Sequence, residues 1–266
     1  MQTPSFLSIN SNNNIAYEYY ENNISAESLT VIFLSGLMSD MNGTKALYLQ
    51  EFCNKHKLNY LKFDYFGHGQ SSGDFIDGTI SIWQQNSVDI INNIVKDKKI
   101  ILVGSSLGGW LMFLITLKLL ESLDNRIAAL LGVASAPDFT KILMWDKFDN
   151  NIKNILADKG VYDMPSDYDD CAYPISMKLI EDGNNNLILN DSLNIINCPI
   201  ILMHGMQDMD VPYDLSIELA HHVGSQDVSV ELLKNADHRM SSPEMLDKIG
   251  DNLLILIEKI SDISLE

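Results

Sequence analysis

Ile100-Ile101-Leu102-Val103-Gly104-Ser105-Ser106-Leu107-Gly108 joins an apolar run to the pattern G-x-S-x-G, and an apolar, helix-like stretch follows at residues 110–120. This order predicts a sharp turn from a strand into a helix, with Ser106 at its tip. A serine in such a turn is lifted clear of the sheet, and glycine two residues to either side leaves room for the crowded backbone. Ser106 is therefore the candidate nucleophile, provided that an acid and a histidine follow it in the chain.

The rest of the chain alternates between β-rich and helix-like segments. This alternation predicts an α/β fold, with an eight-stranded, mostly parallel sheet that carries helices on both faces. Continuous apolar runs suit central strands that are buried on both faces. We expect strands at 5–10, 15–21, 30–35, 60–64, 100–104, 127–134, 200–204 and 228–233, and helices near 43–57, 80–97, 110–120 and 243–261.

Residues 139–197 break this alternation. They begin with apolar residues at helical spacing and continue with turn-rich segments, Pro165-Ser166 and 183–186. We predict a helical lid inserted between strands six and seven, on a core formed by residues 1–138 and 198–266. Its aromatic residues either line an acyl pocket or pack the lid onto the core, and helical spacing favours packing: Trp145, Phe148, Tyr162, Tyr168 and Tyr173.

Charge and hydropathy limit the classes of function. The chain has 266 residues, 46% hydrophobic content and mean hydropathy near zero, which suits one large domain. Its formal net charge of −18 repels nucleic-acid phosphates and anionic lipid surfaces, so nucleic-acid binding is excluded. The longest apolar stretch, 107–117, is shorter than the roughly 20 residues that cross a bilayer, and no stable membrane insertion is expected.

The cysteines and the first residues of the chain bear on compartment. Cys53, Cys171 and Cys198 are odd in number and lack C-x-x-C spacing, which disfavours a disulfide framework or a structural zinc site. The first lysine is Lys45, so the printed sequence starts without the basic residues of secretory and organelle leaders. We therefore expect reduced thiols and a cytoplasmic location.

A serine nucleophile requires a base, and the base requires an acidic partner. The segment 204–212 follows the seventh strand, where a turn would hold a carboxylate at the carboxyl edge of the sheet. Its spacing from the strand favours Asp208 as the acid. Two alternatives stay open: Asp210, two residues further along the turn, and Asp138, after the sixth strand.

His238 follows the last strand, in the loop from which a histidine reaches across to the nucleophile in the chain order Ser, acid, His. We predict that His238 is the base. His68 lies in a glycine-rich loop near the same edge, where a loop-shaping role suits it better. The other histidines are interpreted as structural: His56, His204, His221 and His222.

An acyl-transfer site also needs N–H donors for the developing oxyanion. Leu107 directly follows the nucleophile and begins a helix, so its backbone N–H is one candidate. Leu37 is the other, because the turn at Gly36 lets the loop after the third strand approach Ser106.

These motifs together resemble the α/β-hydrolase superfamily, and most closely its mitochondrial depalmitoylase and acyl-glucuronide esterase branch. The resemblance covers most of the chain, but the printed residues show no transit sequence and the lid matches only in fragments. The segments that carry it are 36–46, Phe52-Cys53, 63–71, 104–112, 204–212 without Gln207, Met209 and Asp210, and 237–240, with the lid fragments 164–166 and 173–176.

The resemblance implies a hydrolase of acyl thioesters, S-palmitoyl groups in particular, and of some acyl esters. Ser106, Asp208 and His238 would then form a catalytic triad that uses no metal or cofactor. A lipase or serine peptidase with the same triad is the alternative within enzymes, and a non-catalytic binding module is the alternative outside them. Acyl-chain length, leaving group and oligomeric state are left open by the sequence.

Overall fold

The computed structural model describes residues 3–22, 28–95, 99–165, 172–189 and 191–262. Eight strands form one sheet in the order β1-β2-β4-β3-β5-β6-β9-β10. The strands pair in parallel from β4 to β10, whereas β1 with β2 and β2 with β4 are antiparallel. Their bounds are β1 Ser5–Ser8, β2 Asn14–Tyr20, β3 Leu29–Leu34, β4 Asn59–Phe63, β5 Lys99–Ser105, β6 Ile127–Val133, β9 Ile200–Gly205 and β10 Val228–Leu233. The predicted eight-stranded, mostly parallel sheet is confirmed.

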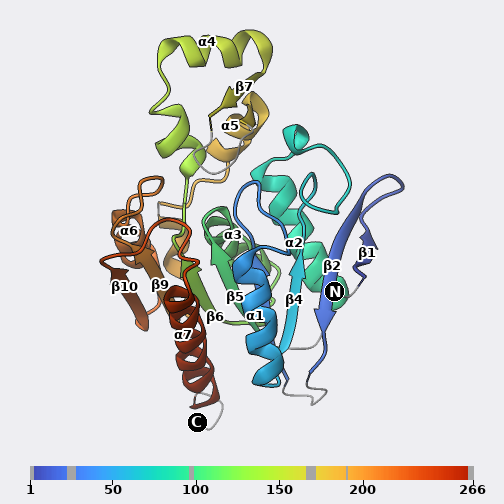
Figure 1. Ribbon diagram of the computed structural model, residues 1–266, viewed down its shortest axis with the longest axis vertical. Coiled ribbons are helices and arrows are strands. Elements are labelled where there is room, and N and C mark those ends of the chain that lie inside the picture. Colours follow the sequence, from blue (N-terminus) through green and yellow to red (C-terminus); the bar gives the residue numbers. More distant parts are fainter. Residues whose placement is uncertain (1–2, 23–27, 96–98, 166–171, 190, 263–266) are drawn as a thin grey trace.

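Helices cover both faces of this sheet (Figure 1). Alternate residues of the central strands enter two separate cores: Ile32 and Leu102 pack on one face, and Val31 and Val103 on the other. The first core includes α2 (Ile80–Ile94), α3 (Leu107–Glu121) and α6 (Asp214–His222), and the second includes α1 (Thr44–Lys55) and α7 (Pro243–Asp262). This two-sided burial explains the long apolar runs within the central strands.

The helix α3 is buried around most of its circumference, which agrees with its uninterrupted apolar sequence. Among the described residues, no helix combines the length and the apolar character needed to cross a membrane.

Most of the segment between β6 and β9 lies beyond the carboxyl ends of the central strands, at the top of Figure 1. We call residues 139–197 the insertion. It contains a π-helical turn, Thr140–Trp145, then α4 (Asn150–Lys159), the antiparallel hairpin of β7 (Val161–Met164) and β8 (Tyr173–Ser176), α5 (Met177–Asn184) and a short 3-10 helix, Asp191–Ile195.

Two details of the insertion differ from the sequence-based expectation. The hairpin β7–β8 was not predicted, and Gly183 and Asn184 end α5 instead of forming a turn. A Cβ on Gly183 would lie 2.1 Å from Oγ1 of Thr140, so this glycine permits close packing of α5 on the π-helical turn. Ser166 and Tyr168 lie outside the described residues.

Candidate active site

Ser106 occupies the predicted turn between β5 and α3. Its backbone has φ 54° and ψ −117°, a conformation that L-residues rarely adopt, and its N–H donates to the carbonyl oxygen of Val133 at 3.0 Å. A Cβ on Gly104 would lie 2.3 Å from the carbonyl oxygen of Gly108, and a Cβ on Gly108 would lie 2.0 Å from that of Leu34. Both glycines are therefore required by backbone contacts, as the G-x-S-x-G pattern predicts.

Ser106, His238 and Asp208 form a chain of hydrogen bonds. Nε2 of His238 lies 3.1 Å from Oγ of Ser106, and Nδ1 lies 2.7 Å from Oδ2 of Asp208. The serine follows β5, the aspartate lies in the turn after β9, and the histidine lies in the loop after β10. Because these parallel strands end at one edge of the sheet, three distant segments meet there.

The carboxylate of Asp208 accepts hydrogen bonds at both oxygens. Oδ1 accepts the N–H groups of Asp210 at 2.9 Å and Val211 at 2.8 Å, and Oδ2 faces His238 and, at 3.0 Å, Nε2 of His204. Burial by itself raises the pKa of Asp208, but the hydrogen bonds from His204 and His238 lower this pKa by more than burial raises it. The pKa of the carboxyl group therefore lies well below its usual range, and the group is ionised.

An ionised Asp208 fixes the tautomer of His238. The carboxylate can only accept, so Nδ1 of His238 carries a hydrogen and Nε2 is left as the acceptor for the hydroxyl of Ser106. This is the protonation state in which the imidazole can remove the serine proton.

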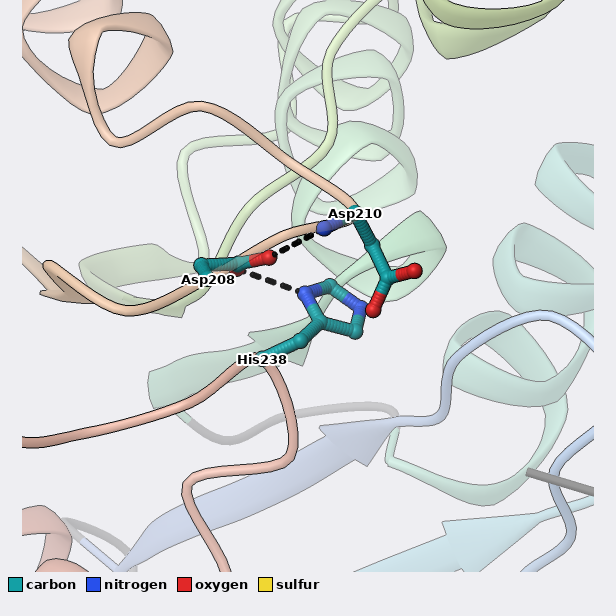
Figure 2. Close-up of side chains that lie close together, drawn as sticks. All are labelled: Asp208, Asp210 and His238. Atoms are coloured by element: carbon teal, nitrogen blue, oxygen red, sulfur yellow. Dashed lines mark hydrogen bonds and ion pairs between the residues drawn. The ribbon is translucent and has the colours of Figure 1, made fainter. Parts of the chain in front are cut away.

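Neither of the two alternative acids makes the hydrogen bond to Nδ1 of His238 that Asp208 makes. Asp210 is exposed, and Figure 2 shows its side chain beside His238, while the dashed contact to the ring comes from Asp208. Asp138 is buried and accepts the N–H groups of Ile188 at 2.8 Å and Leu189 at 3.0 Å. Asp138 therefore ties the start of the insertion to its far end.

Asp208, Asp210 and His238 also offer ligand atoms within 4.8 Å of one another. A cation held by all three would compete with the hydrogen bond between Asp208 and Nδ1 of His238. The bond of 2.7 Å between Oδ2 of Asp208 and Nδ1 of His238 fits a serine-activating arrangement better than a cation site.

The two residues expected to donate to an oxyanion lie beside Ser106. Leu107 is the first residue of α3, so its N–H belongs to the helix turn that has no acceptor within the helix. A Cβ on Gly36 would lie 3.5 Å from Cβ of Ser106, so the backbone of the adjacent Leu37 lies close to Ser106. Leu37 and Leu107 both line the cavity at this site.

The cavity has a volume of about 680 Å³, within the range of about 300–1,000 Å³ that is common for small-molecule sites. Its polar lining includes residues of the loop before α1, of α1 itself and of the loop that carries His238: Ser39, Thr44, Lys45, Arg239 and Ser241. Part of its apolar lining comes from the insertion and from Ala136 before it, and we call these residues the apolar wall: Ala136, Phe139, Leu143, Met144, Met164, Pro165 and Tyr173.

Of the predicted lid aromatics, Tyr173 lines the cavity. Phe148 and Tyr162 pack against each other edge to face at 5.9 Å, and the ammonium of Lys153 lies over the ring of Trp145. Helical spacing marks a buried face without saying what that face contacts, so it could not show which apolar residues of the insertion line the cavity.

Three further polar residues lie near the site: His68 and His204, which the sequence indicated to be structural, and Lys45, for which the sequence predicted no role. The ring of His68 packs on Tyr65 and Trp83, and burial lowers its pKa to about 4, which agrees with a loop-shaping role. His204 contacts the carboxylate of Asp208, as described above. Nζ of Lys45 donates to the carbonyl oxygen of Arg239 at 2.6 Å, and burial lowers its pKa to about 8.

The family model described as alpha/beta hydrolase fold matches residues 30–170. "Palmitoyl-protein thioesterase ABHD10, mitochondrial" from Bos taurus is 36% identical over 260 residues, which are 97% of this chain and 81% of that protein. The protein of the same name from Homo sapiens is 36% identical over 94% of this chain and 78% of its own length.

The fold comparison agrees. The structure of alpha/beta hydrolase domain-containing protein 10 from mouse superposes with a TM-score of 0.85 and 30% identity, covering 97% of this chain and 100% of that one. The relatives named above are mitochondrial, which overturns the expected cytoplasmic location. That expectation used the spacing of the cysteines and the first residues of the printed sequence, and neither of these features identifies the compartment. By family and fold, this chain is a member of the α/β-hydrolase family and a hydrolase.

Proposed function

We propose that this hydrolase is a serine esterase or thioesterase, with Ser106 as nucleophile, His238 as general base and Asp208 as the acid that orients His238. The observation that carries the proposal is the chain of hydrogen bonds from Ser106 through His238 to Asp208 at a cavity. The arrangement meets the geometric requirements of nucleophilic acyl transfer, in which a hydroxyl contacts a base and the base contacts a buried carboxylate.

In the proposed mechanism, Oγ of Ser106 attacks the acyl carbonyl while Nε2 of His238 takes the hydroxyl proton. The negative charge that develops on the carbonyl oxygen is stabilised by the N–H groups of Leu37 and Leu107, each worth about 3–4 kcal/mol in comparable hydrolases. His238 then gives its proton to the leaving group, and an acyl-enzyme remains. Water, activated by the same histidine, releases the acid and restores Ser106. The chemistry requires no metal or cofactor.

The walls of the cavity support an acyl substrate with an apolar chain. We propose that the insertion acts as a lid whose apolar residues Leu143, Met144 and Met164 contact this chain. Methionine side chains are flexible and polarisable, so they adapt to chains of different shape. Thioesters enter the proposal because the relatives are named palmitoyl-protein thioesterases, and the triad itself acts on oxygen esters as well.

Active-site labelling tests the nucleophile. Ser106→Ala should abolish labelling by a fluorophosphonate probe. Ser105→Ala is the matched control, since Ser105 precedes Ser106 on β5 but its side chain is buried. It should retain most of the labelling. Equal labelling of the two variants would exclude Ser106 as the nucleophile.

Substrate profiling tests the acyl specificity. Relative kcat/KM should be measured for p-nitrophenyl esters and S-acyl thioesters of increasing chain length, with matched anilides to detect peptidase activity. We expect kcat/KM to rise with the length of the acyl chain until the chain covers the apolar wall of the cavity. A maximum at acetyl, or faster cleavage of anilides than of esters, would contradict the proposed substrate class.

A further inference from the structure

A second imidazole contacts the carboxylate that orients His238. His204 is the penultimate residue of β9 and is fully buried. Its Nε2 lies 3.0 Å from Oδ2 of Asp208 and 3.0 Å from the carbonyl oxygen of Val211, and its Nδ1 lies 2.7 Å from Oγ of Ser216 on α6. The ring thus connects the turn that carries Asp208 to a helix on the face of the sheet.

These contacts determine the protonation of His204. Nε2 faces a carboxylate oxygen and a carbonyl oxygen, and neither can donate, so Nε2 carries a hydrogen. Nδ1 then accepts the hydroxyl hydrogen of Ser216, whose side chain is also fully buried. Every contact of the ring is satisfied by the neutral form, which avoids burying a charge.

Both imidazoles bond to the same oxygen. Oδ2 of Asp208 faces Nδ1 of His238 at 2.7 Å and Nε2 of His204 at 3.0 Å, while Oδ1 is held by backbone N–H groups. The two rings therefore share one acceptor. Each N–H that donates to Oδ2 reduces the negative charge that is available to the other donor.

We propose that His204 is a positioning residue for the reaction: its Nε2–H holds Oδ2 of Asp208 in line with His238 and withdraws negative charge from that oxygen. The inference rests on the proposed roles of Ser106, His238 and Asp208. His204 acts through Asp208 and contacts neither the substrate nor the reacting atoms.

The proposal predicts how the basicity of His238 responds to loss of the ring. Without the second donor, Oδ2 keeps more negative charge and stabilises the protonated form of His238 more strongly, so the acid limb of the pH profile should move to higher pH. Loss of the donor also lets the carboxylate rotate, which lowers the rate even when His238 is neutral. A residue that only filled space would change stability without moving the acid limb of the pH profile.

His204→Phe removes the donor and keeps a planar ring. Its kcat/KM for an activated ester, measured as a function of pH, should fall on the plateau by about ten- to hundredfold, the equivalent of one hydrogen bond to a charged group. Its acid limb should move upward by about half a unit or more. His204→Gln places an amide N–H near the position of Nε2 and should restore most of both properties.

Other charged groups near His238 are unchanged in these variants. They are Asp210 beside the ring, the flanking Asp237 and Arg239, and Lys45 from α1, whose Nζ bonds to the carbonyl oxygen of Arg239. A shift of the acid limb therefore reports the change at Asp208. Because the pKa of Lys45 is about 8, its titration affects the alkaline side of the profile.

Two further variants distinguish the hydrogen bonding of His204 from a general effect of losing a buried ring. Ser216→Ala leaves the ring in place but removes the hydroxyl that polarises it, so Nε2–H becomes a weaker donor and the acid limb should move in the same direction by less. This variant carries the test if His204→Phe does not fold. His68→Phe is the matched control, since His68 is a buried ring that packs on Tyr65, Phe75 and Trp83. It should leave the acid limb unmoved.

The outcomes distinguish this inference from the mechanism beneath it. Full activity in Ser106→Ala would overturn the proposed mechanism. Loss of activity in Ser106→Ala, with an acid limb in folded His204→Phe that coincides with the wild type or moves to lower pH, would overturn only the role of His204. If His204→Phe does not fold, an acid limb in Ser216→Ala that coincides with the wild type would overturn the role of His204.

Discussion

Asp208→Asn is the substitution that most directly tests the proposed triad. The side chain keeps its shape, but one carboxylate oxygen becomes an NH2 group. Oδ1 accepts two backbone N–H groups, from Asp210 and Val211, whereas Oδ2 faces two imidazole rings. The amide oxygen of asparagine therefore takes the place of Oδ1, and its NH2 group faces His238 and His204.

This orientation reverses the hydrogen bond to His238. An NH2 group can only donate, so Nδ1 must become the acceptor and the ring hydrogen moves to Nε2. Nε2 is the atom 3.1 Å from Oγ of Ser106, and a protonated Nε2 cannot take the serine proton. In a comparable triad the wrong tautomer lowers kcat about 10⁴-fold, which corresponds to about 5.5 kcal/mol in the barrier.

The assay is steady-state hydrolysis of a short-chain p-nitrophenyl ester, with thermal unfolding as the check on folding. Asp210→Asn is the control, because Asp210 is exposed and hydrogen-bonds to Asp208 through its backbone N–H, which the substitution keeps. We expect it to retain kcat within about threefold, the size of a surface-charge effect. If folded Asp208→Asn kept more than about a tenth of the wild-type kcat, or if Asp210→Asn lost more activity than Asp208→Asn, the assignment of the acid would be refuted.

Gly108→Ala would place a Cβ 2.0 Å from the carbonyl oxygen of Leu34, and we expect urea unfolding to show a loss of about 3 kcal/mol or more. Gly160→Ala, with open space but a φ of 76°, should cost only about 1 kcal/mol, and equal losses would contradict the packing argument. Burial lowers the pKa of His68 from 6.5 to about 4, so its neutral ring stabilises the fold fully above pH 6.5 and less as the pH falls toward 4. The free energy of unfolding of wild type relative to His68→Phe should therefore fall by about 3 kcal/mol between pH 7 and pH 4, and a constant difference would show that the ring is not buried neutral. Leu143→Trp narrows the cavity at its apolar wall and should lower kcat/KM for a decanoyl ester about tenfold more than for an acetyl ester. Equal losses would show that the acyl chain does not contact this wall.

The main sheet could be predicted because its signals are local. Strands such as β3 and β5 are short apolar runs next to turns, and their continuous hydrophobicity follows from burial on two faces. The turn at Ser106 could also be predicted, since Gly104 and Gly108 are required by contacts within a few residues and with the adjacent strand β3.

The insertion was harder to predict because its structure depends on contacts between distant segments. Val161–Met164 and Tyr173–Ser176 pair as a hairpin although neither segment alternates clearly between polar and apolar residues. Gly183 suggested a turn, yet it lies in α5 because Thr140 packs against that position. A glycine that permits close packing has the same sequence signature as one that forms a turn.

The sequence by itself determined the α/β class, the eight strands, the strand-to-helix turn at Ser106 and the candidate residues that follow strand ends, because each depends on short-range patterns of hydrophobicity and spacing. Only the tertiary structure decided which carboxylate contacts His238. Asp208 contacts His238 across 30 residues of sequence, and His238 contacts Ser106 across 132, whereas Asp138 binds the insertion. The cavity wall and the contact of His204 with Asp208 were decided in the same way, since distances between side chains on different strands arise only when the sheet brings the strand ends together.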